Sequence, residues 1–142
     1  MTRCLIRMFF LLFAFVNTEK LIKLSDILDD DTYVPIRKGE IFIIEIEGNP
    51  SEGKIWKVDN PQRLLIDNLL KPLNLNEDNT CTFYQSKAES GFANGFYHFK
   101  FETSDKNIGH EQITFTFEDT INNKIIQKTI RLHIINYAKK DL

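Results

Sequence analysis

An alternation of apolar with polar residues recurs along the chain, and this pattern limits the possible folds more than any other feature. It runs through residues 97–102, 112–118 and 129–134, and it ends the segment 41–47, which begins with four apolar β-forming residues. A period of two matches a β-strand, whose successive side chains point to opposite faces, and does not match the period of about 3.6 residues in a helix. Each segment therefore predicts a strand with one apolar face and one polar face.

Strands of this kind bury their apolar faces when two sheets pack against each other. Turn-forming residues separate the strands at 48–50, 104–107 and 122–123. This spacing is typical of an immunoglobulin-like β-sandwich, so we predict an all-β fold of about seven to eight strands. Weaker patterns predict further strands at 33–37, 54–58, 64–66 and 80–85. The third of these lies in a stretch, 64–70, that could instead form a helical turn.

The composition is that of one globular domain that needs neither metals nor disulfides. Hydrophobic residues make up 42% of the chain, and its 12 Phe supply ample apolar side chain for a core. The 18 Lys and Arg nearly balance the 20 Asp and Glu, and no basic run could neutralise a row of phosphates. Nucleic acid is therefore not an expected partner, and no cofactor or metal is expected.

The N-terminus has the pattern of a signal peptide. Arg3 and Arg7 flank an apolar run, residues 8–16, that is too short to span a bilayer. We expect residues 1–18 to be removed and residues 19–142 to form the mature domain, secreted or held in a lysosome-like or vacuole-like compartment, with no membrane partner. The alternative is that this segment is retained as an amphipathic lead-in to the domain.

No set of residues in the sequence predicts catalysis. The three histidines, His98, His110 and His133, show no spacing typical of a metal site or a nucleophile–base pair. His98 and His133 fall on the outward phase of their strands, so we expect exposed imidazoles there. Removal of the signal peptide would leave Cys81 as the remaining cysteine. Because Cys81 has no nearby His and lies among strand-forming residues, we expect it to be buried, and we do not expect the chain to be an enzyme.

The segment 48–56, Gly-Asn-Pro-Ser-Glu-Gly-Lys-Ile-Trp, leaves one strong strand and enters another through Trp56. Pro50 fixes its own φ angle and restricts Asn49, so the loop is stiff and loses little entropy on docking. From these residues alone the loop is either a rigid surface wedge or an ordinary turn. In both cases we expect Trp56 to lie in the core.

This segment is similar to the Asn-Pro-x-x-Gly loop of the chagasin family of cysteine-peptidase inhibitors, which is preceded by Gly and followed three residues later by Trp. The matching residues here are Asn49, Pro50, Ser51, Glu52 and Gly53. The segment before the strand at 97–102 resembles the family's glycine-rich second loop, with Gly91, Phe92, Ala93, Asn94 and Gly95. Its usual closing glycine pair is replaced by Asn94-Gly95, and Asn tolerates glycine-like backbone angles better than most residues.

The family's third loop usually carries Arg-Pro-Trp, and this chain lacks that motif. It continues instead as Phe-Thr-Phe-Glu-Asp-Thr from residue 115. The strand period directs Phe117 inward, so Glu118 and Asp119 are the candidates for a differently charged third loop.

The resemblance implies a reversible, non-covalent inhibitor of papain-like, cathepsin-like cysteine peptidases. Asn49 to Gly53 would form the central wedge over the catalytic Cys and His of the peptidase, with the Ser51 hydroxyl near that His. Gly91 to Gly95 would line the flank of the cleft. Without the third-loop Trp, weaker or narrower inhibition is expected.

Two other function classes stay open on the sequence alone. A secreted immunoglobulin-like module that binds proteins or glycans would tolerate changes at Pro50 and Ser51. A hydrolase that uses Cys81 or the histidines would lose activity when these are replaced and would tolerate changes in the loops. We rank the hydrolase last.

Overall fold

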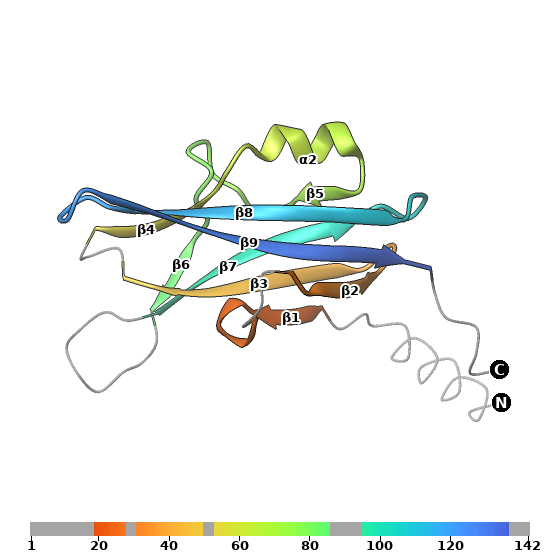
Figure 1. The fold of residues 1–142 in the computed structure, drawn as a ribbon, viewed down its shortest axis with the longest axis horizontal. Coiled ribbons are helices and arrows are strands. Elements are labelled where there is room, and N and C mark those ends of the chain that lie inside the picture. Colours follow the sequence, from red (N-terminus) through yellow and green to blue (C-terminus); the bar gives the residue numbers. More distant parts are fainter. Residues whose placement is uncertain (1–18, 28–30, 50–52, 86–94, 137–142) are drawn as a thin grey trace, which may run out of the picture.

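The computed structural model describes residues 19–27, 31–49, 53–85 and 95–136 (Figure 1). In chain order the elements are β1 (Lys20–Lys23), η1 (a 3-10 helix, Leu24–Asp26), β2 (Tyr33–Arg37), β3 (Ile41–Gly48), β4 (Lys54–Val58), α2 (Pro61–Asp67), β5 (Leu70–Pro72), β6 (Phe83–Gln85), β7 (Gly95–Thr103), β8 (Gly109–Asp119) and β9 (Lys124–Ile135). The expected signal peptide, residues 1–18, lies outside the described residues. In the part of the chain that is described, no helix is long and apolar enough to cross a membrane.

The strands form two sheets. The first has the order β1-β3-β7, with β5 and β6 both paired to the far edge of β7, and the second has the order β2-β9-β8-β4. β1 is parallel to β3 and β2 is parallel to β9, whereas the other pairs are antiparallel. The prediction of an all-β sandwich is confirmed, with nine strands among the described residues where seven to eight were expected.

The alternating segments bury the side chains that their period predicts. Four phenylalanines from the two sheets are fully buried between them, namely Phe42, Phe99, Phe101 and Phe115. The rings of Phe99 and Phe115 join the sheets, with centroids 5.1 Å apart. Each such side chain stabilises the fold by roughly 1.5–3 kcal/mol relative to exposure in water. Packing between the two sheets therefore contributes strongly to the stability of the sandwich.

The strand expected at residues 64–66 is wrong, since these residues belong to α2. Pro61 stands at the start of the helix, where its fixed φ angle suits the first turn, and Asn68 ends it in a left-handed conformation. Pro61 and Leu64 are buried at the helical spacing of three, whereas Leu65 and Ile66 are exposed. The two exposed aliphatic residues gave this stretch its strand-like composition.

The far edge of β7 is shared by two short strands, and a side chain fills the gap between them. β5 pairs with the end of β7 and β6 with its start. Between them the Asn74 amide accepts a hydrogen bond from Lys100 N (2.9 Å) and donates one to His98 O (2.7 Å). Asn74 therefore replaces a strand residue in the ladder. Its side chain satisfies a backbone N–H and a backbone C=O that would otherwise be costly to leave without hydrogen bonds.

Candidate functional site

Three chain connections meet at one end of the sandwich. In the first sheet Gly48, the last residue of β3, pairs with Gly95, the first residue of β7, and Gly95 also pairs with Gln85 at the end of β6. In the second sheet Lys54 pairs with Asp119, which in turn pairs with Lys124. The β3–β4, β6–β7 and β8–β9 connections therefore all lie at this end, on the left of Figure 1. We call it the loop end.

The loop end contains both segments that carry the sequence motifs. The first motif begins after β3 and finishes at Gly53, and the second finishes at Gly95. Seven of the predicted contact residues lie outside the described residues: Pro50, Ser51, Glu52, Gly91, Phe92, Ala93 and Asn94. The residues on which these segments are anchored are described, and they fix where each loop leaves the sandwich.

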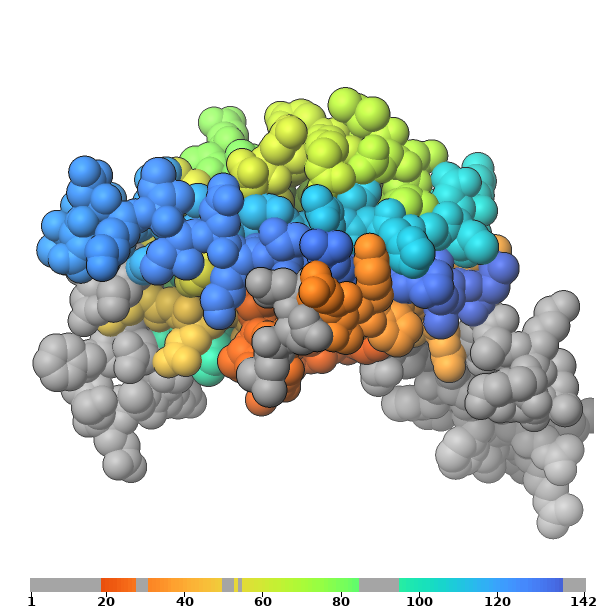
Figure 2. Space-filling model, in the orientation of Figure 1, coloured from red at the N-terminus to blue at the C-terminus, as the bar shows by residue number. Residues whose placement is uncertain are grey.

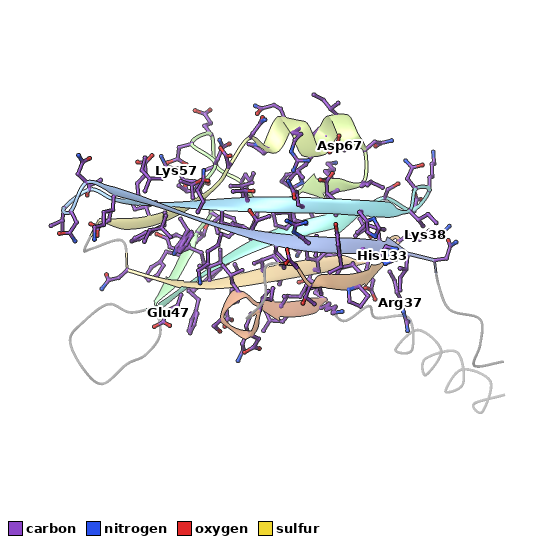
Figure 3. All side chains as sticks on the ribbon, viewed as in Figure 1. Arg37, Lys38, Glu47, Lys57, Asp67 and His133 are labelled. Carbon is purple, nitrogen blue, oxygen red and sulfur yellow. The ribbon has the colours of Figure 1, made fainter. Side chains whose placement is uncertain are left out.

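Trp56 closes the base of the first loop. Its indole is buried, and Nε1 donates a hydrogen bond of 3.2 Å to Glu47 O, directly before the loop. Its ring also packs on Phe117, with centroids 5.1 Å apart. Because Glu47 belongs to the first sheet and Trp56 to the second, this one side chain ties the two sheets together at the loop end, where Figure 3 labels Glu47. The prediction of a core Trp56 is confirmed.

Both glycines of the first motif are required by their surroundings. A Cβ added to Gly48 would lie 2.6 Å from Cε2 and 3.0 Å from Cδ2 of the Tyr97 ring, closer than real contacts allow. Gly53 has φ +74°, which other residues rarely adopt, and an added Cβ would collide with Thr120 Oγ1. The glycine spacing of the motif therefore reflects close packing at both ends of the loop.

Asn49 is placed differently from the surface wedge that it was expected to begin. Only 6% of the residue is exposed, so its side chain lies within the protein. Gly95, at the end of the second motif, is likewise buried and paired on both sides. These two residues therefore anchor their loops to the sandwich.

The two acidic residues suggested for a third loop differ in their surroundings. Asp119 is only 8% exposed, and its carboxylate accepts hydrogen bonds from Ile121 N (3.2 Å), Asn122 N (3.2 Å) and Asn122 Nδ2 (2.8 Å). Glu118 lies on the outer face of the sheet, with Oε2 3.8 Å from Lys57 Nζ. Phe117 points inward as predicted. The charge of Asp119 is used to hold the turn rather than to face a partner.

The residues considered for catalysis do not assemble into a reactive centre. Cys81 is buried, and burial raises the pKa of its thiol to about 12, so the thiol stays protonated at neutral pH. His98 lies on an outer sheet face with Nε2 2.8 Å from Glu45 Oε2, while the His110 and His133 rings lie 4.5 Å apart at the other end of the sandwich. Within the described residues, no group of three or more His, Cys, Asp and Glu could hold a metal ion.

An ion pair between a buried glutamate and a partly exposed arginine lies under α2, away from the loop end. Glu111 Oε1 is 2.8 Å from Arg63 Nη1, which also contacts Asp67 Oδ2 at 2.8 Å, while Arg63 Nη2 donates to Gln112 O. Desolvation raises the pKa of Glu111 despite the hydrogen bond from Arg63. Arg63 thus fixes α2 over the part of the β8 edge that β4 leaves uncovered, which is a structural role.

Comparisons with known proteins identify the fold. A scan against protein-family models finds no match, and a search of curated protein sequences finds none. Among solved structures, the solution structure of amebosin matches with a TM-score of 0.56 and 19% identity, over 84% of this chain and 100% of amebosin. The structure of PbICP-C in complex with falcipain-2 matches with a TM-score of 0.42 and 16% identity, over 83% of this chain and 99% of that one.

The likeness to amebosin shows a shared fold. That fold is the two-sheet, immunoglobulin-like sandwich predicted from the alternation and spacing of the strands, so the comparison agrees with that prediction.

Proposed function

We propose that this protein is a reversible, non-covalent inhibitor of papain-like, cathepsin-like cysteine peptidases that blocks the substrate cleft with its loop end. One observation carries the proposal: the two segments that resemble the inhibitory loops join the sandwich at the same end, where Gly48 and Gly95 are direct partners across β3 and β7. Because β3 and β7 pair antiparallel, the end of β3 and the start of β7 lie together, so both loops could enter one cleft at the same time.

The first loop acts as the wedge in this proposal. By resemblance to the family, Pro50 and Ser51 would cover the reactive Cys and His of the peptidase, and the Ser51 hydroxyl would approach that His. The wedge needs a firm base, and the hydrogen bond from Trp56 to Glu47 together with the tight packing of Gly48 on Tyr97 supplies one. A base held in this way reduces the conformational entropy lost on docking.

Inhibition without a covalent bond follows from the same stiffness. A rigid loop fills the cleft without presenting a carbonyl in the geometry needed for attack, so the peptidase cannot cleave it efficiently. The protein itself needs no reactive group for this mechanism, and the thiol of Cys81 is buried with a raised pKa. The proposal includes export through the segment 1–18, which would bring the protein to compartments where such peptidases work.

The test is a titration of papain and of a lysosomal cathepsin with the chain from Glu19 onward, where the described fold begins. A second protein carries Gly and Ser in place of residues 49–53, and a matched control carries Asp105→Gly with Lys106→Ser in the β7–β8 turn at the opposite end. We expect stoichiometric inhibition by the wild type and the control, and loss of inhibition in the loop variant.

Full activity of every papain-like peptidase tried at micromolar wild-type protein would overturn the proposal. Equal inhibition by the wild type and by the loop variant would overturn the wedge mechanism. Failure of inhibition by a folded wild type would favour the alternative, a secreted module that binds proteins or glycans.

A further inference from the structure

The turn between β8 and β9 carries a group of exposed isoleucines. Ile121 is 72% exposed, Ile125 is 71% exposed and Ile126 is 44% exposed. We call these three residues the isoleucine tip, and Figure 2 shows the β8–β9 turn, in blue, projecting at the loop end of the molecule. Neighbouring exposed aliphatic side chains do not contribute to the core and are typical of surfaces that bind a partner.

The isoleucine tip continues an apolar row that starts inside the protein. Trp56, Phe117 and Ile126 occupy successive register positions across β4, β8 and β9. Trp56 and Phe117 are buried, whereas Ile126 at the end of the row is partly exposed. Ile125 points to the opposite face from Ile126, so the tip presents apolar surface on both sides of the hairpin.

The position of Ile121 is fixed by its own turn. The Asp119 carboxylate holds the backbone N–H groups of Ile121 and Asn122, and Asn123 adopts the left-handed conformation with φ 52°. Asp119 and Lys124 close the ladder on either side of the turn. Because the backbone that carries Ile121 is held in this way, little backbone entropy is lost when the side chain is covered, which favours a role in binding.

Ile121 also lies directly beside the wedge. A Cβ built on Gly53 would lie 3.9 Å from Ile121 Cγ1, so the side chain of Ile121 borders the last residue of the first loop. Any surface that receives the wedge therefore comes within reach of Ile121.

We propose that Ile121, supported by the rest of the isoleucine tip, is an apolar anchor of the complex and packs on a nonpolar wall beside the cleft of the inhibited peptidase. This inference rests on the proposed function and assigns the third contact to an aliphatic side chain instead of to Glu118 or Asp119. It also predicts that peptidases with a polar or charged wall at this position are inhibited less well.

The test compares inhibition constants of the chain from Glu19 onward against a peptidase that the wild type inhibits. Ile121→Ser is expected to raise the inhibition constant about tenfold or more, equivalent to about 1.4 kcal/mol. Ile121→Leu should stay within about threefold of the wild type, because an apolar contact tolerates a change of shape. The matched control, Ile66→Ser, removes an isoleucine that is 81% exposed on α2 and should have no effect.

Far-UV circular dichroism and thermal unfolding show whether each variant keeps the fold. An unchanged inhibition constant for a folded Ile121→Ser protein would overturn the inference and leave the proposed function standing, provided that the variant with residues 49–53 replaced is inactive. A change in oligomeric state without a change in the inhibition constant would assign the tip to contacts between two copies and would also overturn it. A wild type that inhibits no peptidase would overturn both proposals.

Discussion

Replacement of Trp56 by Phe tests whether one hydrogen bond and one ring hold the loop end together. Phenylalanine keeps an aromatic ring beside Phe117 but removes Nε1, which donates 3.2 Å to Glu47 O. Loss of that hydrogen bond costs about 1 kcal/mol. The smaller ring forfeits part of the buried area and leaves a small cavity, for about another 1 kcal/mol.

We therefore expect Trp56→Phe to lower the free energy of unfolding by about 2 kcal/mol, which shifts the urea midpoint down by roughly 1 M. Trp56 is the single tryptophan of the chain, so unfolding of both proteins is followed by far-UV circular dichroism rather than by fluorescence. The control is Tyr33→Phe, an exposed aromatic residue at the other end of the sandwich, which should shift stability by less than about 0.5 kcal/mol.

The same variant separates stability from function. In the absence of urea, where both proteins are folded, Trp56→Phe should still weaken inhibition, because the base of the first loop has lost its hydrogen bond to Glu47 of β3. A midpoint equal to that of the wild type, within error, would refute the account of Trp56 as the link between the sheets. An altered midpoint with unchanged inhibition would refute its role as the base of the wedge.

Three further predictions follow from particular contacts. Gly48→Ala should lower both the thermal midpoint and the inhibitory potency, because the added methyl group meets the Tyr97 ring; a variant as stable and as inhibitory as the wild type would contradict this. Cys81 in the folded chain from Glu19 onward should resist a thiol-specific reagent at pH 8, because its pKa is about 12, and should react fully in guanidinium; rapid labelling of the native protein would exclude burial. The raised pKa of Glu111 means that the folded state binds a proton more readily than the unfolded state, so the stability of the wild type relative to Glu111→Gln should increase as the pH falls from 7 toward 4.5, and urea titrations that show the opposite trend would contradict the assignment.

The strong strands could be predicted because their period depends only on which face is buried. The alternation is seen along β3, β7 and β8 and in the predicted part of β9, residues 129–134, whereas the first five residues of β9 are all exposed. For the region of α2 the sequence favoured a strand, with a helical turn as the alternative. Two of its apolar residues are exposed, and this hides the helical spacing of Pro61 and Leu64. β1 and β5 are too short for a period to be recognised in the sequence. They form because β3 and β7 each offer an edge with which they can pair.

The candidate site was predictable in part. The motif in residues 48–56 identified the first loop, and the structure explains its two glycines and its Trp through contacts with Tyr97, Thr120 and Glu47. Burial of Asp119 could not be foreseen, because a carboxylate that holds its own turn looks the same in sequence as one that faces a partner. The exposure of Ile121 was equally hidden, since aliphatic residues are expected in the core.

Competition with substrate tests the central claim most directly. The rate of a papain-like peptidase would be measured at several concentrations of a peptide substrate and of the chain from Glu19 onward. The account predicts that the apparent inhibition constant rises linearly with the substrate concentration, because inhibitor and substrate occupy one cleft. An apparent constant that does not change with substrate concentration, or a peptidase that is not inhibited at all, would contradict occlusion of the cleft by the loop end.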